Sequence, residues 1–379
     1  MKLQRCARCV MDTTDPDITF DSAGVCNHCL HYDDQSERHV ISGAEGDRLL
    51  AAIVARVKND GKRKPYDCIM GVSGGVDSTY SVYLAKRMGL RPLAVHLDNG
   101  WDSELAVKNI ERVLRTLEID LVTVVLDWDE FRDLQVAFLK ASTPDSEIPT
   151  DHAIISVMFS HAEKHGLKHV LTGFNVRTES HIPRAWSSGH SDWRYIRTVQ
   201  KRFGSRRLST YPRTPFVRLL RLRRAQEWTH ILNYVDYHKQ RAKDVLKSEV
   251  GWVDYGGKHY ESIYTRFYQG YILPRKFGFD KRKAHFSSLI CSGQMTRGDA
   301  LTELVKPPYP LDQQEADRAY VIKKLHLTES EFQEIMEKPR LRYADYPSMD
   351  RFYKGRFYRG MRAIYRVTAK PLLSRMNTG

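Results

Sequence analysis

The stretch from Asp67 to Thr79 constrains the fold of this chain more than any other. It begins with a short apolar run, Asp67 to Val72, continues through Ser73-Gly74-Gly75, and enters a helix pattern near Asp77. Glycine lacks a Cβ, so the backbone can turn sharply here and bring its N–H groups close to a ligand. The positive end of the following helix faces the same place, which favours an anion. The stretch therefore predicts a strand, a phosphate-binding loop and a helix, with Asp77 suited to holding Mg²⁺ on phosphate oxygens.

Apolar strands alternate with helix patterns from Tyr66 onward, as a parallel doubly wound sheet requires. We expect strands at about 67–72, 92–97, 121–126 and 168–172, with helices through Met88 and at about 103–118, 130–140 and 151–165. From about residue 181 the pattern becomes helical, and Phe216–Trp228 is predicted to be a basic amphipathic helix. The predicted fold class is α/β: a doubly wound, mostly parallel sheet, with an N-terminal zinc knuckle and a mainly helical C-terminal region. The predicted domains are residues 1–35, 36–180 and 181–379.

Three segments with chemically active side chains follow predicted strands, at residues 73–79, 98–101 and 173–180. In a doubly wound sheet the ligand lies off the carboxyl ends of the strands. We therefore expect the three segments at one edge of the sheet, around one ligand.

Four cysteines near the N-terminus form two pairs, Cys6-x-x-Cys9 and Cys26-x-x-Cys29, and 16 residues separate the pairs. This spacing is typical of a zinc site, because each pair can present two thiolates to one ion. Four protein ligands leave no open coordination position, so the predicted zinc is structural. His28 and His31 lie nearby and could each replace a thiolate, but we interpret them as spare.

The formal net charge is +14, and residues 181–250 alone hold 16 Lys or Arg against 5 Asp or Glu. Such a surface fits an anionic partner, namely nucleic acid, a nucleotide-linked substrate or an acidic protein, although a solvated basic face has the same composition. No apolar run reaches the roughly 18 residues of a membrane-spanning helix. Because Met1 to Arg5 lead into Cys6 without an apolar signal region, we expect a cytoplasmic protein with no membrane span.

Ser73-Gly74-Gly75-Val76-Asp77-Ser78 resembles the pyrophosphate loop of the N-type ATP pyrophosphatases, whose fold is adenine nucleotide α-hydrolase-like. It is not a Walker A loop, because the Lys-Ser/Thr ending is missing. The resemblance implies that ATP is cut between its α- and β-phosphates and that AMP is attached to a substrate oxygen. It implies the following ATP- and pyrophosphate-binding residues: Ser73, Gly74, Gly75, Val76, Asp77, Ser78, Asp98, Asn99 and Gly173.

Some of these roles leave an alternative open. Asp98 and Asn99 could border the adenosine or simply make the turn after the second strand. Glu179 could help to hold Mg²⁺ or could be an acid in the first turn of a helix. We expect Ser73, Asp77 and Glu179 to be catalytic.

Four features together resemble a narrower family, the N-acetyl sugar amidotransferases of bacterial surface-polysaccharide synthesis. They are the cysteine knuckle, SGGVDS, TGFNVRTES and FDKRKAHFSSLICSGQMTRGDAL, and the resemblance covers nearly the whole chain. It implies conversion of an acetamido group on a nucleotide-linked sugar, of the UDP-diacetamido-uronic acid kind, into an acetamidino group. The products of such enzymes belong to lipopolysaccharide O-antigens or flagellar glycans. Candidate sugar contacts, each of which could equally be solvated, are Arg184, Lys281, Arg282 and Lys283.

The nitrogen source is predicted from an absence. An N-terminal nucleophile glutaminase needs a mature N-terminal cysteine, whereas this sequence starts Met1-Lys2. Cys291 lacks the glycine of a class I nucleophile turn and lies in a helix pattern, so we interpret it as a core thiol. The family resemblance therefore implies two separate partners, a glutaminase and an ammonia-channelling barrel like the pair used in histidine synthesis.

Two other functions fit parts of the sequence. A tRNA-thiolating enzyme can also join cysteine knuckles to SGGxDS, and the basic segment with its aromatics fits RNA. Thiolation usually needs reactive cysteines, however, and Cys68 lies in an apolar strand where a thiol is inert. We therefore do not favour a nucleic-acid partner. A zinc-bearing adaptor without catalysis is disfavoured by the intact SGGVDS.

Overall fold

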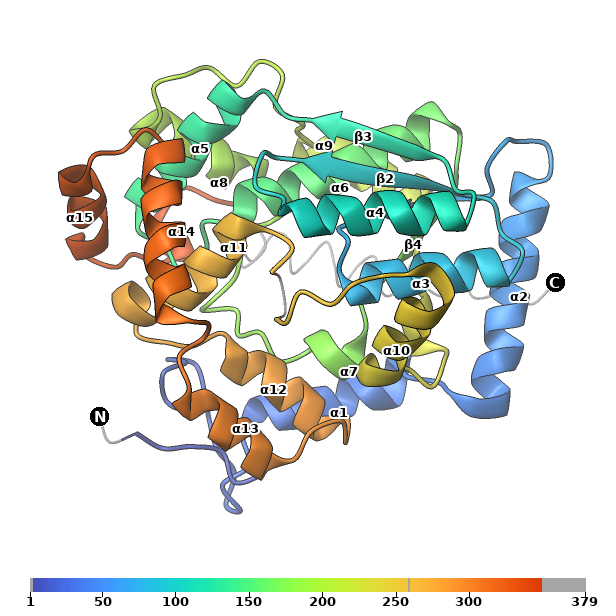
Figure 1. Ribbon diagram of the computed structural model, residues 1–379, viewed down its shortest axis with the longest axis horizontal. Coiled ribbons are helices and arrows are strands. Elements are labelled where there is room, and N and C mark those ends of the chain that lie inside the picture. The colour runs from blue at the N-terminus through green and yellow to red at the C-terminus, as the bar shows by residue number, and fades with distance from the viewer. Residues whose placement is uncertain (1–2, 258–259, 350–379) are drawn as a thin grey trace, which may run out of the picture.

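The computed structural model describes residues 3–257 and 260–349, and in this part the chain folds around a five-stranded parallel sheet (Figure 1). The strands are β1 (Cys68–Gly71), β2 (Pro92–Asp98), β3 (Leu121–Val125), β4 (His169–Thr172) and β5 (Glu227–His230). Their order is β3-β2-β1-β4-β5, and each neighbouring pair is parallel. The predicted doubly wound sheet is confirmed, and the four expected strands begin and end within one residue of their predicted bounds.

The helices before β5 are α1 (Asn27–His39), α2 (Gly43–Gly61), α3 (Val76–Arg87), α4 (Glu104–Thr116), α5 (Trp128–Ala141), α6 (Ile148–Lys164), α7 (Val176–Glu179), α8 (Trp193–Phe203) and α9 (Phe216–Ala225). Those after it are α10 (Lys239–Val250), α11 (Ile263–Phe267), the π-helical η2 (Tyr268–Phe277), α12 (Arg282–Cys291), α13 (Arg297–Val305), α14 (Leu311–Lys324) and α15 (Glu329–Glu337). Short 3₁₀ turns cover Ile231–Asn233 and Tyr343–Asp345. Every described helix is too short or too polar to cross a membrane.

Both faces of the central strand β1 are buried, because successive side chains of an apolar strand point to opposite sides. In β1, Ile69 packs with Val157 and Met158 of α6 on one face. Cys68 and Met70 point the other way, into a cluster formed with α2, α3, α4 and α10. Strand β1 is thus packed on both of its faces, which fixes the position where the loop after it begins.

The strand order creates a crevice between β1 and β4. From β1 the chain moves outward to β2 and β3, then returns to add β4 and β5 on the other side. The loops after β1 and β4 diverge at such a reversal, and ligands of doubly wound folds bind there. The order therefore brings residues 73–79 beside residues 173–179, whereas residues 98–101 lie one strand away.

The fifth strand departs from the sequence prediction. The helix expected over Phe216–Trp228 ends at Ala225, and Glu227–His230 then pairs in parallel with β4 at the edge of the sheet. All four residues of β5 are only partly buried. Four residues without a run of apolar side chains give no strand signal, so only the tertiary position beside β4 decides their conformation. The remaining described residues beyond residue 181 are mainly helical, as predicted.

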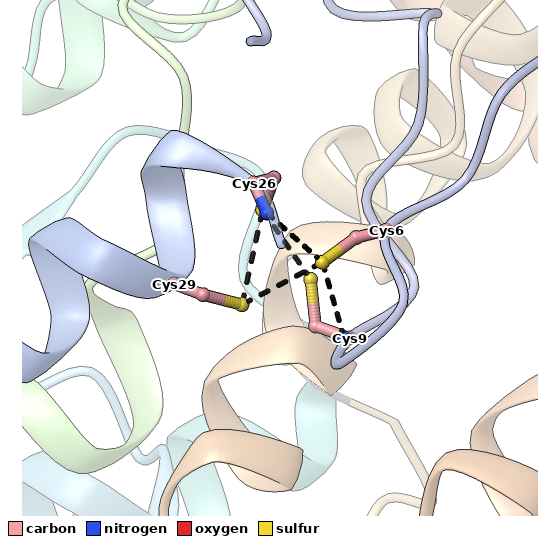
Figure 2. Close-up of side chains that lie close together, drawn as sticks. All are labelled: Cys6, Cys9, Cys26 and Cys29. Carbon is pink, nitrogen blue, oxygen red and sulfur yellow. Dashed lines mark hydrogen bonds between the residues drawn. The ribbon is translucent and has the colours of Figure 1, made fainter. Parts of the chain in front are cut away.

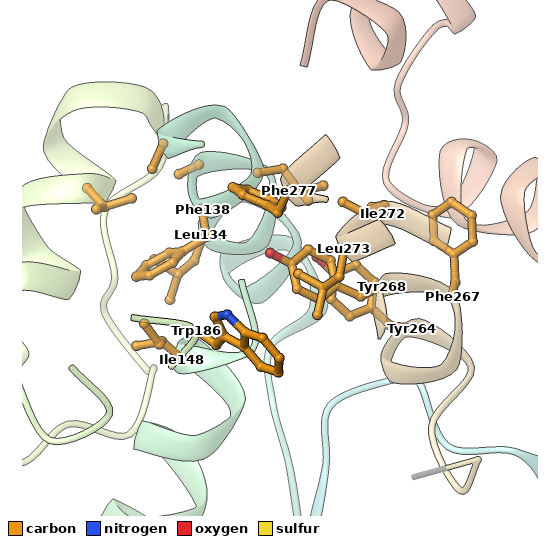
Figure 3. Packing of buried hydrophobic residues seen from close by; sticks show 14 of the residues in the cluster. Leu134, Phe138, Ile148, Trp186, Tyr264, Phe267, Tyr268, Ile272, Leu273 and Phe277 are labelled. Carbon is orange, nitrogen blue, oxygen red and sulfur yellow. The ribbon is translucent and has the colours of Figure 1, made fainter. Parts of the chain in front are cut away.

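The C-terminal helices share one core with the α/β part. Figure 3 shows Phe138 of α5 close to Tyr268 and Phe277 of η2, with Trp186 beneath them. Trp186 stacks on Phe279, with ring centroids 4.2 Å apart. The described helical region is therefore built onto the sheet through α5.

Candidate active site

The loop after β1 has a conformation that needs glycine at one position. Gly74 has φ +78°, and a Cβ there would lie 2.9 Å from the carbonyl oxygen of Ala106. Gly75 then caps α3, and the Ser78 hydroxyl donates to the Gly75 carbonyl at 3.1 Å. The Ser73 and Ser78 hydroxyl oxygens are 3.2 Å apart. The serine hydroxyl groups thus stabilise the loop through contacts within it, and the twelve-residue helix α3 begins directly after the loop.

A cavity of about 260 Å³ lies at this loop. Asp77 and Glu179 line it together, so the end of β1 and the end of β4 each bring a carboxylate to one space. Gly173 approaches the loop closely, because a Cβ on it would lie 2.7 Å from the Asp77 carbonyl. Of the predicted ATP-site residues, the structure gathers around this cavity Ser73, Gly75, Val76, Asp77, Ser78, Gly173 and Glu179.

Three aromatic residues far along the chain hold this loop in place. The Trp252 indole N–H donates to the Gly74 carbonyl at 2.8 Å, and the Tyr255 hydroxyl donates to the same oxygen at 3.3 Å. The Tyr237 hydroxyl donates to Asp77 Oδ1. Burial, together with the negative charge of Asp77, raises the pKa of Tyr237, which keeps this tyrosine a neutral donor. Our sequence interpretation missed all three, since only the turn-rich character of the segment after Trp252 was visible.

A second cavity, of about 410 Å³, opens beside the first. Lys239, Lys243, Gly256 and Gly257 line both cavities, so the two spaces adjoin. The Lys243 ammonium lies 2.8 Å from Asp254, another residue of the first cavity. The wall of the second cavity is rich in cationic and imidazole side chains, including Lys239, Lys243, Arg266, Lys281, Arg282, His238 and His285.

The four cations proposed for sugar binding lie at three different places. Lys281 and Arg282 line the second cavity, and each also has an acidic partner: Glu147 at 3.4 Å and Asp280 at 2.7 Å respectively. The other two are elsewhere. The ammonium of Lys283 is 2.6 Å from Asp12 of the knuckle, and Arg184 lines a separate cavity of about 1010 Å³.

Asp98 and Asn99 use their side chains within the turn after β2. Asp98 Oδ1 accepts from the N–H of Gly100 at 2.8 Å, and Asn99 Oδ1 accepts from the N–H of Trp101 at 3.1 Å. Asn99 Nδ2 donates to Thr150 Oγ1 at 3.0 Å. The turn-making interpretation therefore describes their contacts, and an adenosine contact stays a prediction.

The four knuckle cysteines converge as their spacing predicts (Figure 2). Their sulfur atoms are fully buried and lie 3.9 Å (Cys6–Cys29), 3.7 Å (Cys9–Cys26) and 3.8 Å (Cys26–Cys29) apart. With zinc–sulfur bonds of about 2.3 Å, a tetrahedral ion separates its sulfurs by about 3.8 Å. The set is compatible with zinc, whereas His28 pairs with Asp15 at 2.6 Å and is spare.

The knuckle is fastened to the C-terminal helices. The Arg297 guanidinium donates to the carbonyl oxygens of Cys9 and Cys6 at 3.1 and 3.0 Å. Lys283 of α12 reaches the buried Asp12, as described above. Ser287 Oγ of the same helix accepts from the N–H of Val10 at 3.3 Å. These contacts hold the knuckle against α12, and Arg282, His285, Phe286 and Leu289 of that helix line the second cavity.

Comparison with known families gives one match. Residues 261–361 match the family model described as LPS biosynthesis protein WbpG-like, C-terminal domain. The match confirms the resemblance to proteins of surface-polysaccharide synthesis over this segment, of which residues 350–361 lie outside the described part. No curated protein matches the chain.

Among solved structures, two similar ones come from bacterial synthetases. The NH3-dependent NAD synthetase of Campylobacter jejuni is 15% identical, with a TM-score of 0.27 over 35% of this chain and 58% of its own. The NMN synthetase of Francisella tularensis is 17% identical, with a TM-score of 0.25 over 34% of this chain and 55% of its own. The chain thus spans little more than half the length of either structure.

Proposed function

We propose that this chain, whose C-terminal segment is similar to the WbpG-like proteins of LPS biosynthesis, is an ATP-dependent amidotransferase. Its substrate is a nucleotide-linked sugar, of the UDP-diacetamido-uronic acid kind, and it converts one acetamido group into an acetamidino group for O-antigen or a related surface polysaccharide. The observation that carries the proposal is the adjacency of two cavities. The glycine loop builds one, and most residues of the other belong to the WbpG-like segment.

The reaction needs ATP because an amide oxygen is a poor leaving group. In the proposed first step the acetamido oxygen attacks the α-phosphorus, AMP becomes bonded to that oxygen, and pyrophosphate leaves. Ammonia then attacks the activated carbon, the carbon–oxygen bond breaks, AMP departs with the former amide oxygen, and a proton leaves the nitrogen. The products are the amidine, AMP and pyrophosphate.

The loop residues have roles that follow from their positions. Ser73, Ser78 and the N-terminus of α3 face the pyrophosphate, where hydroxyl and N–H donors stabilise the departing negative charge. Asp77 and Glu179 suit a Mg²⁺ ion, which would supply charge neutralisation on the phosphate oxygens. Tyr237 acts as a positioning residue, because its hydroxyl fixes the Asp77 carboxylate.

The second cavity suits an anionic sugar nucleotide. Lys281 and Arg282 can exchange their internal carboxylate partners for the diphosphate or the uronic carboxylate of the substrate. Lys239 and Lys243 lie where the two cavities meet, so they suit the boundary between the sugar and the phosphates of ATP. Closing water out of this space protects the adenylated amide from hydrolysis.

The rival function, tRNA thiolation, lacks a suitably placed thiol. Cys68 is fully buried in β1, and burial raises its pKa, so the thiol stays protonated and unreactive. Cys291 lies beside the knuckle, 3.7 Å from Cys29, rather than at the loop cavity. The positions of both cysteines outside the knuckle therefore favour amidine formation over sulfur transfer.

The proposal is tested by incubating the purified chain with ATP, Mg²⁺, an ammonium salt and a panel of diacetamido sugar nucleotides. Mass spectrometry should show oxygen replaced by NH in one sugar, with AMP and pyrophosphate formed in equal amounts. Asp77→Asn should abolish both products while the fold is kept. Asp236→Asn, the same change on an exposed carboxylate paired with Arg241, should leave turnover unchanged. Formation of ADP would refute the proposed chemistry.

A further inference from the structure

A second group of metal-binding side chains lies against the knuckle. Cys291 Sγ is 3.7 Å from Cys29 Sγ and 3.6 Å from His181 Nε2. The three ligand atoms all lie within 4.8 Å of one another. They come from α1, from the segment after α7 and from the last residue of α12, so the fold alone brings them together. Cys29 belongs both to this group and to the four-cysteine group.

The separations are those of ligands around one tetrahedral ion. Zinc–sulfur bonds of about 2.3 Å and zinc–nitrogen bonds of about 2.0–2.1 Å place two sulfurs about 3.8 Å apart, and a sulfur and a nitrogen about 3.6 Å apart. The Cys29–Cys291 and Cys291–His181 distances are 3.7 and 3.6 Å. They agree with the expected separations between ligand atoms as closely as the sulfur–sulfur distances within the knuckle do.

His181 is oriented as a metal ligand is. Its side chain is fully buried, and its Nδ1 lies 3.1 Å from the Ser288 hydroxyl oxygen. The Nδ1 atom is also 3.4 Å from the Ser180 hydroxyl oxygen. A proton on Nδ1 satisfies the Ser288 contact while the Ser288 hydroxyl donates to the Ala284 carbonyl. Nε2 then carries the lone pair and faces Cys291. A histidine whose other nitrogen is held by such a hydrogen bond is the usual arrangement at metal sites.

We propose that Cys29, His181 and Cys291 bind a second divalent ion of the zinc class, which shares the Cys29 thiolate with the knuckle ion. Three protein ligands leave one coordination position for water or another small ligand. His181 follows Glu179 of the loop cavity by two residues, and α12 lines the second cavity. The ion would therefore link the segment after α7 to the end of α12, and other residues of these two elements line the two cavities. This inference is independent of the reaction proposed above.

Metal content provides the first test. Full-length protein purified under reducing conditions with added zinc, then passed through a desalting column, should hold about two equivalents of zinc. His181→Gln and Cys291→Ala should each lower this to about one and keep the knuckle ion. Cys68→Ala, which removes a buried thiol at a distance from both groups, should keep both ions. About one equivalent in the wild type, unchanged by His181→Gln, would overturn the proposal.

X-ray absorption of the wild-type zinc protein tests the same site without any variant. Bonds to nitrogen should appear beside a majority of bonds to sulfur, with a zinc–zinc distance that reflects the shared thiolate. A zinc environment of sulfur alone is what the knuckle ion by itself would give, and it would refute a histidine-bound second ion. This measurement decides the question even if a variant fails to fold.

Discussion

Replacing Gly173 by alanine should disable the ATP site without breaking the fold. The new Cβ would lie 2.7 Å from the carbonyl carbon and oxygen of Asp77 and 2.8 Å from the amide nitrogen of Ser78. Ordinary contact begins at 3.4 Å, so the two segments must move apart by about 0.7 Å. The obstruction is backbone, which cannot rotate away as a side-chain end can. The backbone of Gly173 does not have a positive φ, so alanine can adopt its conformation and meets only steric crowding there.

A displacement of this size at a phosphate loop has a calculable cost. A misplacement of about 1 Å can lower turnover by about 100-fold, and overpacking costs about 1–3 kcal/mol of stability. We expect kcat/KM for ATP, followed by AMP release, to fall by about 100-fold in Gly173→Ala. Gly298→Ala, in α13 and with its nearest neighbour 3.8 Å away, is the matched control and should keep full activity. Activity within about twofold of wild type in Gly173→Ala, far short of the 100-fold loss, would refute the close packing of β4 on the loop.

Three further predictions concern the knuckle, the nitrogen source and acid stability. Cys6→Ser should release the knuckle zinc and cost several kcal/mol of local folding free energy, measured by metal analysis and limited proteolysis; full zinc retention would contradict the knuckle assignment. The isolated chain should form amidine from ammonium salts, more steeply as pH rises and NH3 increases, but not from glutamine; efficient glutamine use would exclude the separate partners. His152 is buried, which lowers its pKa to about 4, and its Nε2 accepts from the N–H of Thr214. Between about pH 6.5 and pH 4 the imidazole of His152 binds a proton in the unfolded state but not in the folded state. Lowering the pH through this range should therefore reduce the free energy of unfolding by up to about 3 kcal/mol. Urea unfolding of the wild type and of His152→Gln at pH 7 and pH 5 measures this loss. An equal change in the free energy of unfolding between the two pH values for both proteins would refute the prediction.

The loop and the first four strands were predictable because their signals are local. Apolar runs, Gly74-Gly75 and the helix beginning near Asp77 all lie within a short stretch of chain, and the spacing of the four cysteines is equally local. The alternation of strands and helices placed the segments after β1, β2 and β4 at one edge of the sheet, whereas the strand order that sets β1 beside β4 was not predicted. Sequence reasoning could therefore name Asp77, Gly173 and Glu179 as residues of one site.

The missed residues depend on contacts between distant parts of the chain. Trp252 reaches Gly74 across 178 residues, and Tyr237 reaches Asp77 across 160. Hydrogen bonds of this kind leave no periodic pattern, since a buried tryptophan or tyrosine fits any core. The contact between Cys291 and Cys29 was not visible for the same reason, because 262 residues separate them.

The attachment of the knuckle to α12 and α13 fixes an order of events during synthesis. Cys6 and Cys9 leave the ribosome first, but Arg297, which donates to their carbonyl oxygens, comes 291 residues after Cys6. At about 5–20 residues per second, the interval is roughly 15–60 s. The knuckle therefore emerges early and lacks its contacts with α12 and α13 until those two helices have been made. A chain stopped before Arg297 would keep the contacts of Asp12 and Val10 with α12 but would lack the two hydrogen bonds that Arg297 gives to the knuckle.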